Sequence, residues 1–173
     1  YGVGPLRANT ALLNWYGQSG SGVGGLSALK YGQDLKTAFR LGFNLVILHH
    51  DETEWDTLTA TPHDQRRIDV WWRADATSRL MLLLAYLMTR DNEWKKASIR
   101  VLTTGSGERI SRAQNDLAKT LEDVRIDAQP HVVDDDSPET IIANSADSDF
   151  VFMPFTIREF KLCHHNGYSL NRV

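Results

Sequence analysis

The stretch from Ile68 to Trp94 constrains the fold more strongly than the other segments of the chain. It begins with the β-branched, acidic and aromatic residues Ile68–Trp72, a composition typical of a half-buried strand. Thr77 or Ser78 then offers a hydroxyl oxygen to the free amides at the start of a helix. The next residues, Leu80–Met88, are apolar almost all round the helix, which indicates that it lies between two layers.

Length and composition exclude several classes of protein. The apolar run Leu80–Met88 is too short for a membrane span, which needs roughly 20 apolar residues in succession. With 173 residues, 42% of them hydrophobic, the chain is long enough for one well-buried core. A net charge of -3 and scattered Lys and Arg give no reason to expect a nucleic-acid partner. The lone Cys163 excludes an internal disulfide and favours a reducing compartment.

Predicted strands and helices alternate along the chain. This order predicts an α/β fold of three layers, a mostly parallel, Rossmann-like sheet with helices on both faces. The polar, histidine-containing residues 49–67 are predicted to form a loop, and no element is predicted beyond residue 154. Strands are predicted at residues 10–15, 43–48, 68–72, 97–102, 128–133 and 149–153, and helices at 26–41, 80–88, 108–124 and 138–144.

The candidate core belongs to the central strand and helix. Trp71 and Trp72 are adjacent, so on a strand they point to opposite faces. One of them is expected to fill the core, while the other meets a covering helix or a partner chain. The predicted core residues are Ile68, Val70, Trp71, Trp72, Leu82 and Leu83.

Four blocks of the sequence, in order, carry a family resemblance. They are Gly2–Trp15, Arg67–Trp72, Leu80–Met88 and Glu93–Thr103. Together they resemble the cytosolic C-terminal domain of the cation-chloride cotransporters, in register over about residues 2–155. Three departures from the family pattern are Pro5 in place of a glycine, residues 74–77 in place of an Asp-Gly-Gly segment, and the unmatched residues 17–25 and 156–173.

This resemblance implies a function and a set of partners. It implies a regulatory domain on the cytoplasmic side of the membrane, built from two α/β subdomains similar to universal stress proteins. Residues 1–155 would form a single α/β domain, the second subdomain plus the last strand of the first, and residues 156–173 a tail. The implied partners are a second copy in a homodimer, the transmembrane domain, and the first C-terminal subdomain of the same transporter.

Glycine-rich segments support an alternative, a nucleotide-binding sensor that resembles universal stress proteins. Residues 20–25 fit the pattern G-x-G-x-x-G, and glycines before a helix can expose amides to a phosphate. Each segment also has a structural interpretation as a flexible loop or a tight turn. Under the alternative the cofactor is ATP; otherwise we expect none. The candidate nucleotide-binding residues are Gly2, Gly4, Arg7, Gly105 and Gly107.

Histidine and carboxylate clusters suggest metal binding less strongly than they suggest solvated surface. His49–Asp56, with His63 and Asp64, holds enough imidazole and carboxylate groups for a divalent metal, but a long polar loop does not fix ligand distances. His164 and His165, beside the lone cysteine, are expected in a frayed or docking tail. Asp134–Asp136 is interpreted as charge at a helix N-terminus. No G-x-S-x-G motif occurs, so we expect neither a metal site nor a catalytic residue, and a protein that is not an enzyme.

Overall fold

The computed structural model describes residues 9–15, 24–49, 52–158 and 161–170. The chain divides into two compact units. Unit 1 consists of Tyr1–Trp55 with Phe155–Arg172, and unit 2 of Asp56–Pro154. The predicted division into an α/β domain over residues 1–155 and a tail over residues 156–173 stays a prediction.

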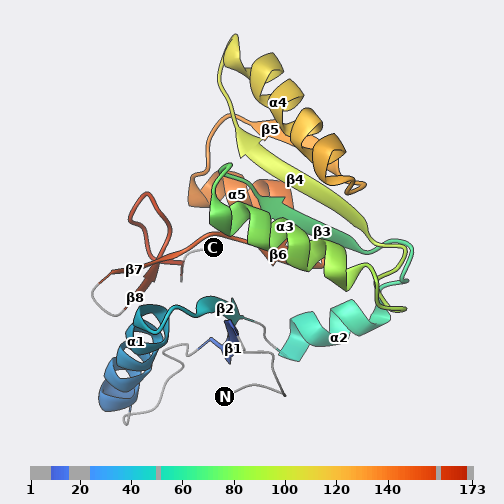
Figure 1. Ribbon diagram of the computed structural model, residues 1–173. Helices are drawn as coiled ribbons and strands as arrows, with labels where there is room; N and C mark the ends of the chain where they lie inside the picture. The colour runs from blue at the N-terminus through green and yellow to red at the C-terminus, as the bar shows by residue number, and fades with distance from the viewer. Residues whose placement is uncertain (1–8, 16–23, 50–51, 159–160, 171–173) are drawn as a thin grey trace. The chain divides into compact units, whose positions relative to one another are not determined.

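Unit 2 contains a parallel four-stranded sheet in the order β5-β4-β3-β6 (Figure 1). The strand order reverses at β3, since β4 and β5 extend the sheet on one side of it and β6 on the other. This is the arrangement of a Rossmann-like fold. The elements are β3 (Arg67–Trp71), α3 (Ala76–Met88), β4 (Ser98–Thr104), α4 (Arg109–Val124), β5 (Gln129–Val133), α5 (Pro138–Ser145) and β6 (Phe150–Phe152).

The helices of unit 2 cover both faces of this sheet, as the sequence predicts. Successive side chains of a strand point to opposite faces. Ile68 and Val70 therefore face α3 and α4, while Asp69 and Trp71 between them face α5. The predicted edge strand is confirmed too: β5, which contains Pro130, pairs only with β4 among the described strands.

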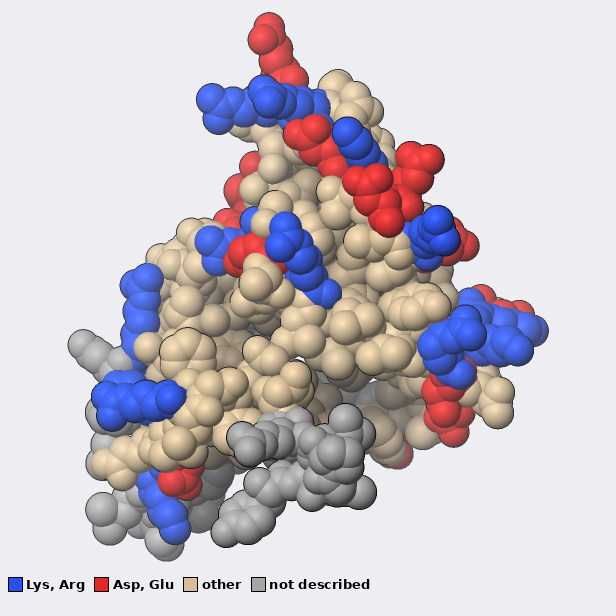
Figure 2. Space-filling view, in the orientation of Figure 1, with Lys and Arg blue, Asp and Glu red and all other residues tan. Residues whose placement is uncertain are grey.

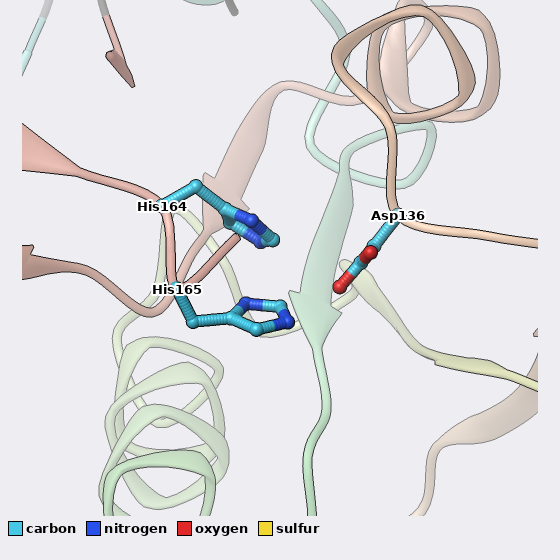
Figure 3. Close-up of side chains that lie close together, drawn as sticks. All are labelled: Asp136, His164 and His165. Atoms are coloured by element: carbon cyan, nitrogen blue, oxygen red, sulfur yellow. The ribbon is translucent and has the colours of Figure 1, made fainter. Parts of the chain in front are cut away.

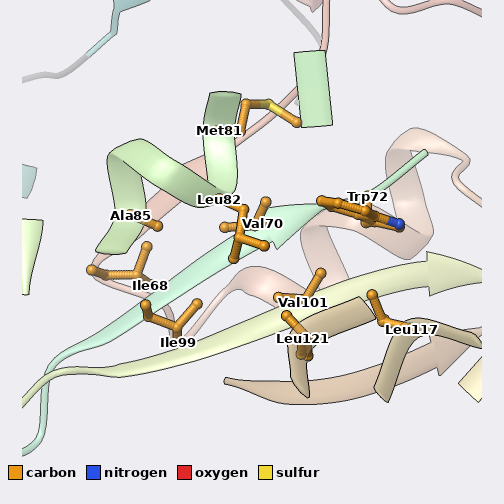
Figure 4. Packing of buried hydrophobic residues seen from close by; sticks show 10 residues of the cluster. All are labelled: Ile68, Val70, Trp72, Met81, Leu82, Ala85, Ile99, Val101, Leu117 and Leu121. Carbon is orange, nitrogen blue, oxygen red and sulfur yellow. The ribbon is translucent and has the colours of Figure 1, made fainter. Parts of the chain in front are cut away.

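The main hydrophobic core lies between the sheet and helices α3 and α4 (Figure 4). Burial of these apolar side chains is the principal source of stability for a layered fold of this kind. Five of the six predicted core residues are buried, with Trp71 on the α5 face of the sheet. The cluster comprises Ile68, Val70, Trp72, Met81, Leu82, Ala85, Ile99, Val101, Leu117 and Leu121.

Leu83 is the predicted core residue that the structure contradicts. Its side chain is 47% exposed, and Leu87 one turn later is 52% exposed. The sheet covers one side of α3, where Met81, Leu82 and Ala85 are buried, and helical spacing turns the other leucines outward. The prediction that this helix lies between two layers is therefore wrong for its outer side, which the described residues leave exposed. Among the described residues, no helix combines the length and hydropathy that a membrane crossing needs.

Helix α3 begins with a cap that differs from the predicted one. Asp75, not Thr77 or Ser78, is the N-cap, and its carboxylate accepts hydrogen bonds from the Ser78 amide and hydroxyl, each at 2.8 Å. The Ser78 hydroxyl oxygen in turn accepts from the Arg73 amide at 2.8 Å. Burial raises the pKa of Asp75, but the Ser78 hydrogen bonds and the Arg73 charge outweigh it and hold that pKa below its ordinary value. The carboxylate stays charged at the positive end of the helix.

Unit 1 has its own small sheets. Strand β1 (Thr10–Asn14), helix α1 (Gly24–Arg40) and strand β2 (Asn44–Leu48) form a βαβ unit in which the two strands pair in parallel. These strands do not belong to the four-stranded sheet, so the expectation of one sheet for the whole chain is wrong. Strands β7 (Thr156–Arg158) and β8 (Lys161–Cys163) form an antiparallel pair beyond residue 154, where no element was predicted.

Another difference from prediction is helix α2 (Glu52–Ala60), which lies in the predicted loop 49–67. Its described side chains are exposed except for Leu58, so the sequence lacks the apolar repeat of a helix packed on a core.

Candidate functional site

An open hollow borders the carboxyl ends of β4 and β5 in unit 2. Ligands of open α/β sheets bind outside the carboxyl ends of the strands, which makes this the first place to examine. The hollow has a volume of about 450 Å³ and contains Gly105, one of the five predicted nucleotide-binding residues. It is lined by Thr104, Gly105, Ser106, Arg109, Arg112, Ala113, Asp116 and Asp134.

The charges of this hollow are mixed. Arg112 forms an exposed ion pair with Asp116, with Nε and Oδ2 3.8 Å apart, and Asp134 adds a second carboxylate. Figure 2 shows Lys and Arg side chains interleaved with Asp and Glu over α4. A phosphate site requires a surplus of positive charge, and the two carboxylates offset the two guanidinium groups.

Local backbone structure explains why glycine stands at positions 105 and 107, in the turn between β4 and α4. A Cβ atom on Gly105 would lie 2.9 Å from Val132 Cγ1 and 3.4 Å from Ile110 Cα, so only glycine lets the turn approach β5. The Gly105 amide donates to the Val133 carbonyl at 2.9 Å, which occupies the donor that a phosphate would need. Gly107 has φ +57°, in the left-handed region that favours glycine. The nucleotide-binding role of Gly105 and Gly107 stays a prediction.

The remaining nucleotide candidates lie outside the described residues. They are Gly2, Gly4 and Arg7, and most of the glycine-rich residues 20–25 lie there too. Gly24 and Gly25 begin α1.

A buried ion pair lies on the opposite, α5-covered face of the sheet. Asp69 has no exposed surface, and it lies beside Arg100 in the parallel register of β3 and β4. Arg100 donates from Nε to Oδ1 at 3.0 Å and from a terminal nitrogen to Oδ2 at 2.6 Å, a bidentate geometry. The Ser145 hydroxyl donates to Oδ2 at 2.7 Å. Both carboxylate oxygens are therefore occupied, which leaves Asp69 without a free oxygen to act as a general base.

The same network fastens α5 to the sheet. Arg100 also donates to the Asn144 carbonyl, and Trp71 Nε1 donates to the Ser145 hydroxyl oxygen at 3.2 Å. Because these contacts fall on the last turn of α5, the guanidinium charge stabilises the negative end of the helix. The sequence analysis missed this network. Its signal was a pair of opposite charges, Asp69 and Arg100, at matching positions of two neighbouring apolar strands.

The acidic residues before α5 lie at its N-terminus, as predicted. Ser137 is the N-cap and Pro138 follows it, while the Asp135 carboxylate accepts from the Ser137 amide at 2.9 Å. Hydrogen bonds from the Thr140 and Ser137 hydroxyls and the Ser137 amide lower the pKa of Asp135 to about 2. Asp135 is therefore a local turn group that keeps its charge over the physiological range.

His164 and His165 of unit 1 lie with their rings close together (Figure 3). His164 is only 2% exposed, stacks on Tyr168 with ring centroids 4.4 Å apart, and has the His165 ring at 4.0 Å. Of the two alternatives predicted for this segment, a frayed tail is therefore wrong for His164, whereas a docking tail stays a prediction. Asp136, also drawn in Figure 3, belongs to unit 2.

A comparison with known protein families decides the relationship of the chain. The model of Solute carrier family 12 matches residues 54–161, which is more than half of the sequence. The chain belongs to solute carrier family 12, the cation-chloride cotransporters. The family prediction made from the four sequence blocks is thereby confirmed. In this family member the match covers all of Asp56–Pro154 in unit 2, including two blocks of the resemblance that the Asp69–Arg100 ion pair joins.

Proposed function

We propose that the chain is a regulatory and dimerisation domain, not an enzyme, on the cytoplasmic side of a membrane cation-chloride cotransporter. The family match over residues 54–161 carries this proposal, because it connects unit 2 to a family of ion transporters. The proposed partners are a second copy of the chain, the transmembrane domain and the first C-terminal subdomain of the same transporter.

An apolar stripe on the outer side of α3 supports association. We define the α3 stripe as Leu80, Leu83, Leu84 and Leu87. Leu83 and Leu87 are about half exposed, and Leu80 and Leu84 are partly buried. Their spacing of three and four residues is typical of a helix that packs against another helix. Figure 2 shows an uncharged surface over the later part of α3, whereas charged side chains lie over its start and over α4.

The proposed regulation rests on thermodynamic linkage between association of the dimer and the conformation of the transporter. If the dimer fits one conformation of the membrane-embedded part better than another, association stabilises that conformation by the difference in binding free energy. A helix of 13 residues is about 20 Å long, so the α3 stripe alone is smaller than a standard interface of about 1,600 Å². We therefore expect weak association of the isolated chain.

Sedimentation equilibrium of the purified chain tests the dimerisation. The apparent mass should rise with concentration from 19.5 kDa towards twice that value. Replacing Leu83 and Leu87 together by glutamate should keep the mass at the monomer value, because four carboxylates would then be buried in the contact. Val124→Glu is the matched control, since Val124 on α4 is 50% exposed and should not affect association.

The regulatory role is tested in the intact transporter. The Leu83→Glu/Leu87→Glu variant should change chloride-dependent cation flux at an unchanged amount of transporter on the cell surface, whereas Val124→Glu should not. A chain that stays monomeric at millimolar concentration contradicts dimerisation. Unchanged flux in a variant shown to be monomeric contradicts regulation through the dimer.

A further inference from the structure

The chain passes between the two units at Trp55–Asp56 and again at Pro154–Phe155. The first of these passages falls inside the nine-residue helix α2. Isolated helices shorter than about 12 residues are marginal in water. Of the side chains described in α2, only that of Leu58 is partly buried. The helix therefore needs support from elsewhere in the structure.

Arg66 supplies that support at the C-terminal end of α2. One terminal nitrogen of its guanidinium group donates to the Leu58 carbonyl at 3.0 Å. Pro62, four positions after Leu58, has no amide hydrogen, so this carbonyl accepts instead from the Thr61 amide at 3.2 Å and from Arg66. The last turn of α2 has no basic residue of its own, and the Arg66 charge lies where the helix dipole favours a cation.

Residues outside α2 hold the rest of the Arg66 guanidinium group. The second terminal nitrogen donates to the Glu93 carbonyl at 3.1 Å, and the guanidinium carbon lies 5.2 Å from the Trp94 ring centroid. Trp94 packs edge-on against Phe150 of β6, and the Ser98 amide donates to the Arg66 carbonyl at 3.0 Å. The Arg66 side chain thus joins α2 to the turn before β4, and its backbone carbonyl bonds the first residue of β4.

The contacts that hold the Arg66 side chain are of moderate strength. Arg66 is only 4% exposed, yet among the described residues no carboxylate forms an ion pair with it, and its Nε has no hydrogen-bond partner. Two backbone carbonyls and one aromatic ring therefore balance a buried charge. Such contacts are weaker than the bidentate carboxylate pair at Asp69, so they open at a lower cost in free energy.

We propose that Arg66 is a releasable anchor that keeps α2 helical and attached to unit 2, and so sets the length of this one of the two connections between the units. Nine residues span about 14 Å as a helix and about 30 Å when extended. Release of Arg66 lets α2 unwind and lengthens this connection. This inference goes beyond the proposed function, because it requires neither association nor transport.

Limited proteolysis of the full chain tests the anchor. Chymotrypsin cleaves after Trp55 and Leu58 only when α2 opens. Arg66→Gln should raise cleavage at these two sites by about tenfold, the size expected from losing a charge-assisted hydrogen bond, and Arg66→Lys should raise it less. Arg67→Gln is the control: the Arg67 side chain is less buried, 28% exposed, and it contacts Ser148 and Asp69 instead of α2.

A rescue variant separates helix opening from general unfolding. Thr57→Ala with Thr59→Ala raises the helix propensity of α2 without restoring the Arg66 contacts, and it should reverse most of the effect of Arg66→Gln. Hydrogen exchange of α3 reports on unit 2 and should stay unchanged throughout. Cleavage at the wild-type rate in Arg66→Gln, loss of α3 protection to the same degree, or failure of the rescue would each overturn the proposal.

Discussion

Asp69 shows how one buried charge organises a face of the sheet. An ionised carboxylate with no exposed surface is costly to bury, and the cost is offset only if its oxygens are paired. Arg100 and Ser145 supply those partners, and both also contact the last turn of α5. The position of α5 against the sheet therefore depends on a network of a few polar atoms.

Asp69→Asn should destabilise unit 2 by about 3–5 kcal/mol, because it leaves the mostly buried guanidinium of Arg100 without its counter-charge. Urea unfolding followed by circular dichroism measures the change in the free energy of unfolding. Asp116→Asn is the control: it removes an ion pair whose side chains are 86% and 75% exposed, and should change stability little.

A double variant distinguishes the effect of removing the whole Asp69–Arg100 ion pair from the effect of leaving one of its charges unpaired. Asp69→Asn combined with Arg100→Met removes both charges, and should be more stable than Asp69→Asn alone. A double variant as unstable as the sum of the two single variants would contradict a charge-pairing role for Asp69.

At the scale of the elements, the sequence predicted the sheet of unit 2 well because its signals are strong. Apolar and β-branched runs mark β3, β4 and β6, and the repeat through Leu117 and Leu121 marks α4. It failed at α2, a helix without an apolar repeat that the Arg66 side chain supports from six residues beyond its end. It also failed at β7 and β8, which are too short, at three residues each, to show alternation.

The candidate site was less predictable than the fold. A glycine after a strand has the same appearance in sequence whether its amide is free for a ligand or occupied by a neighbouring strand. Gly105 is of the second kind, since its amide donates to Val133. Likewise, Asp69 and Arg100 lie 31 positions apart, and only the register of β3 and β4 brings them together.

Gly105→Ala should destabilise the chain by about 1–3 kcal/mol, because the new methyl group would lie 2.9 Å from Val132 Cγ1 in the turn between β4 and α4. The free energy of urea unfolding checks this value. Val132→Ala removes the clashing atom, so the two substitutions together should cost less than the sum of their separate effects. Additive costs would mean that Val132 is not the reason for glycine at this position.

At the scale of the whole molecule, the two units bury different sets of side chains. Unit 2 contains the cluster between the sheet and helices α3 and α4. Unit 1 buries Leu35 of α1, together with Leu162, Cys163 and His164 at β8 and the turn that follows. Because each unit has its own buried residues, they are expected to open separately.

Matched leucine truncations test this expectation in the intact chain. Leu82 on α3 is 2% exposed and Leu35 on α1 is 1% exposed, so Leu82→Ala and Leu35→Ala remove the same atoms from equally buried positions. Each should cost its own unit about 2–5 kcal/mol. Hydrogen exchange should then quicken in β3 and α3 for Leu82→Ala, and in α1 and β2 for Leu35→Ala, with little change in the other unit. If either substitution accelerates exchange equally in both units, the chain opens as a single cooperative structure. That result would also contradict the proposal that Arg66 controls a connection between separate units at α2.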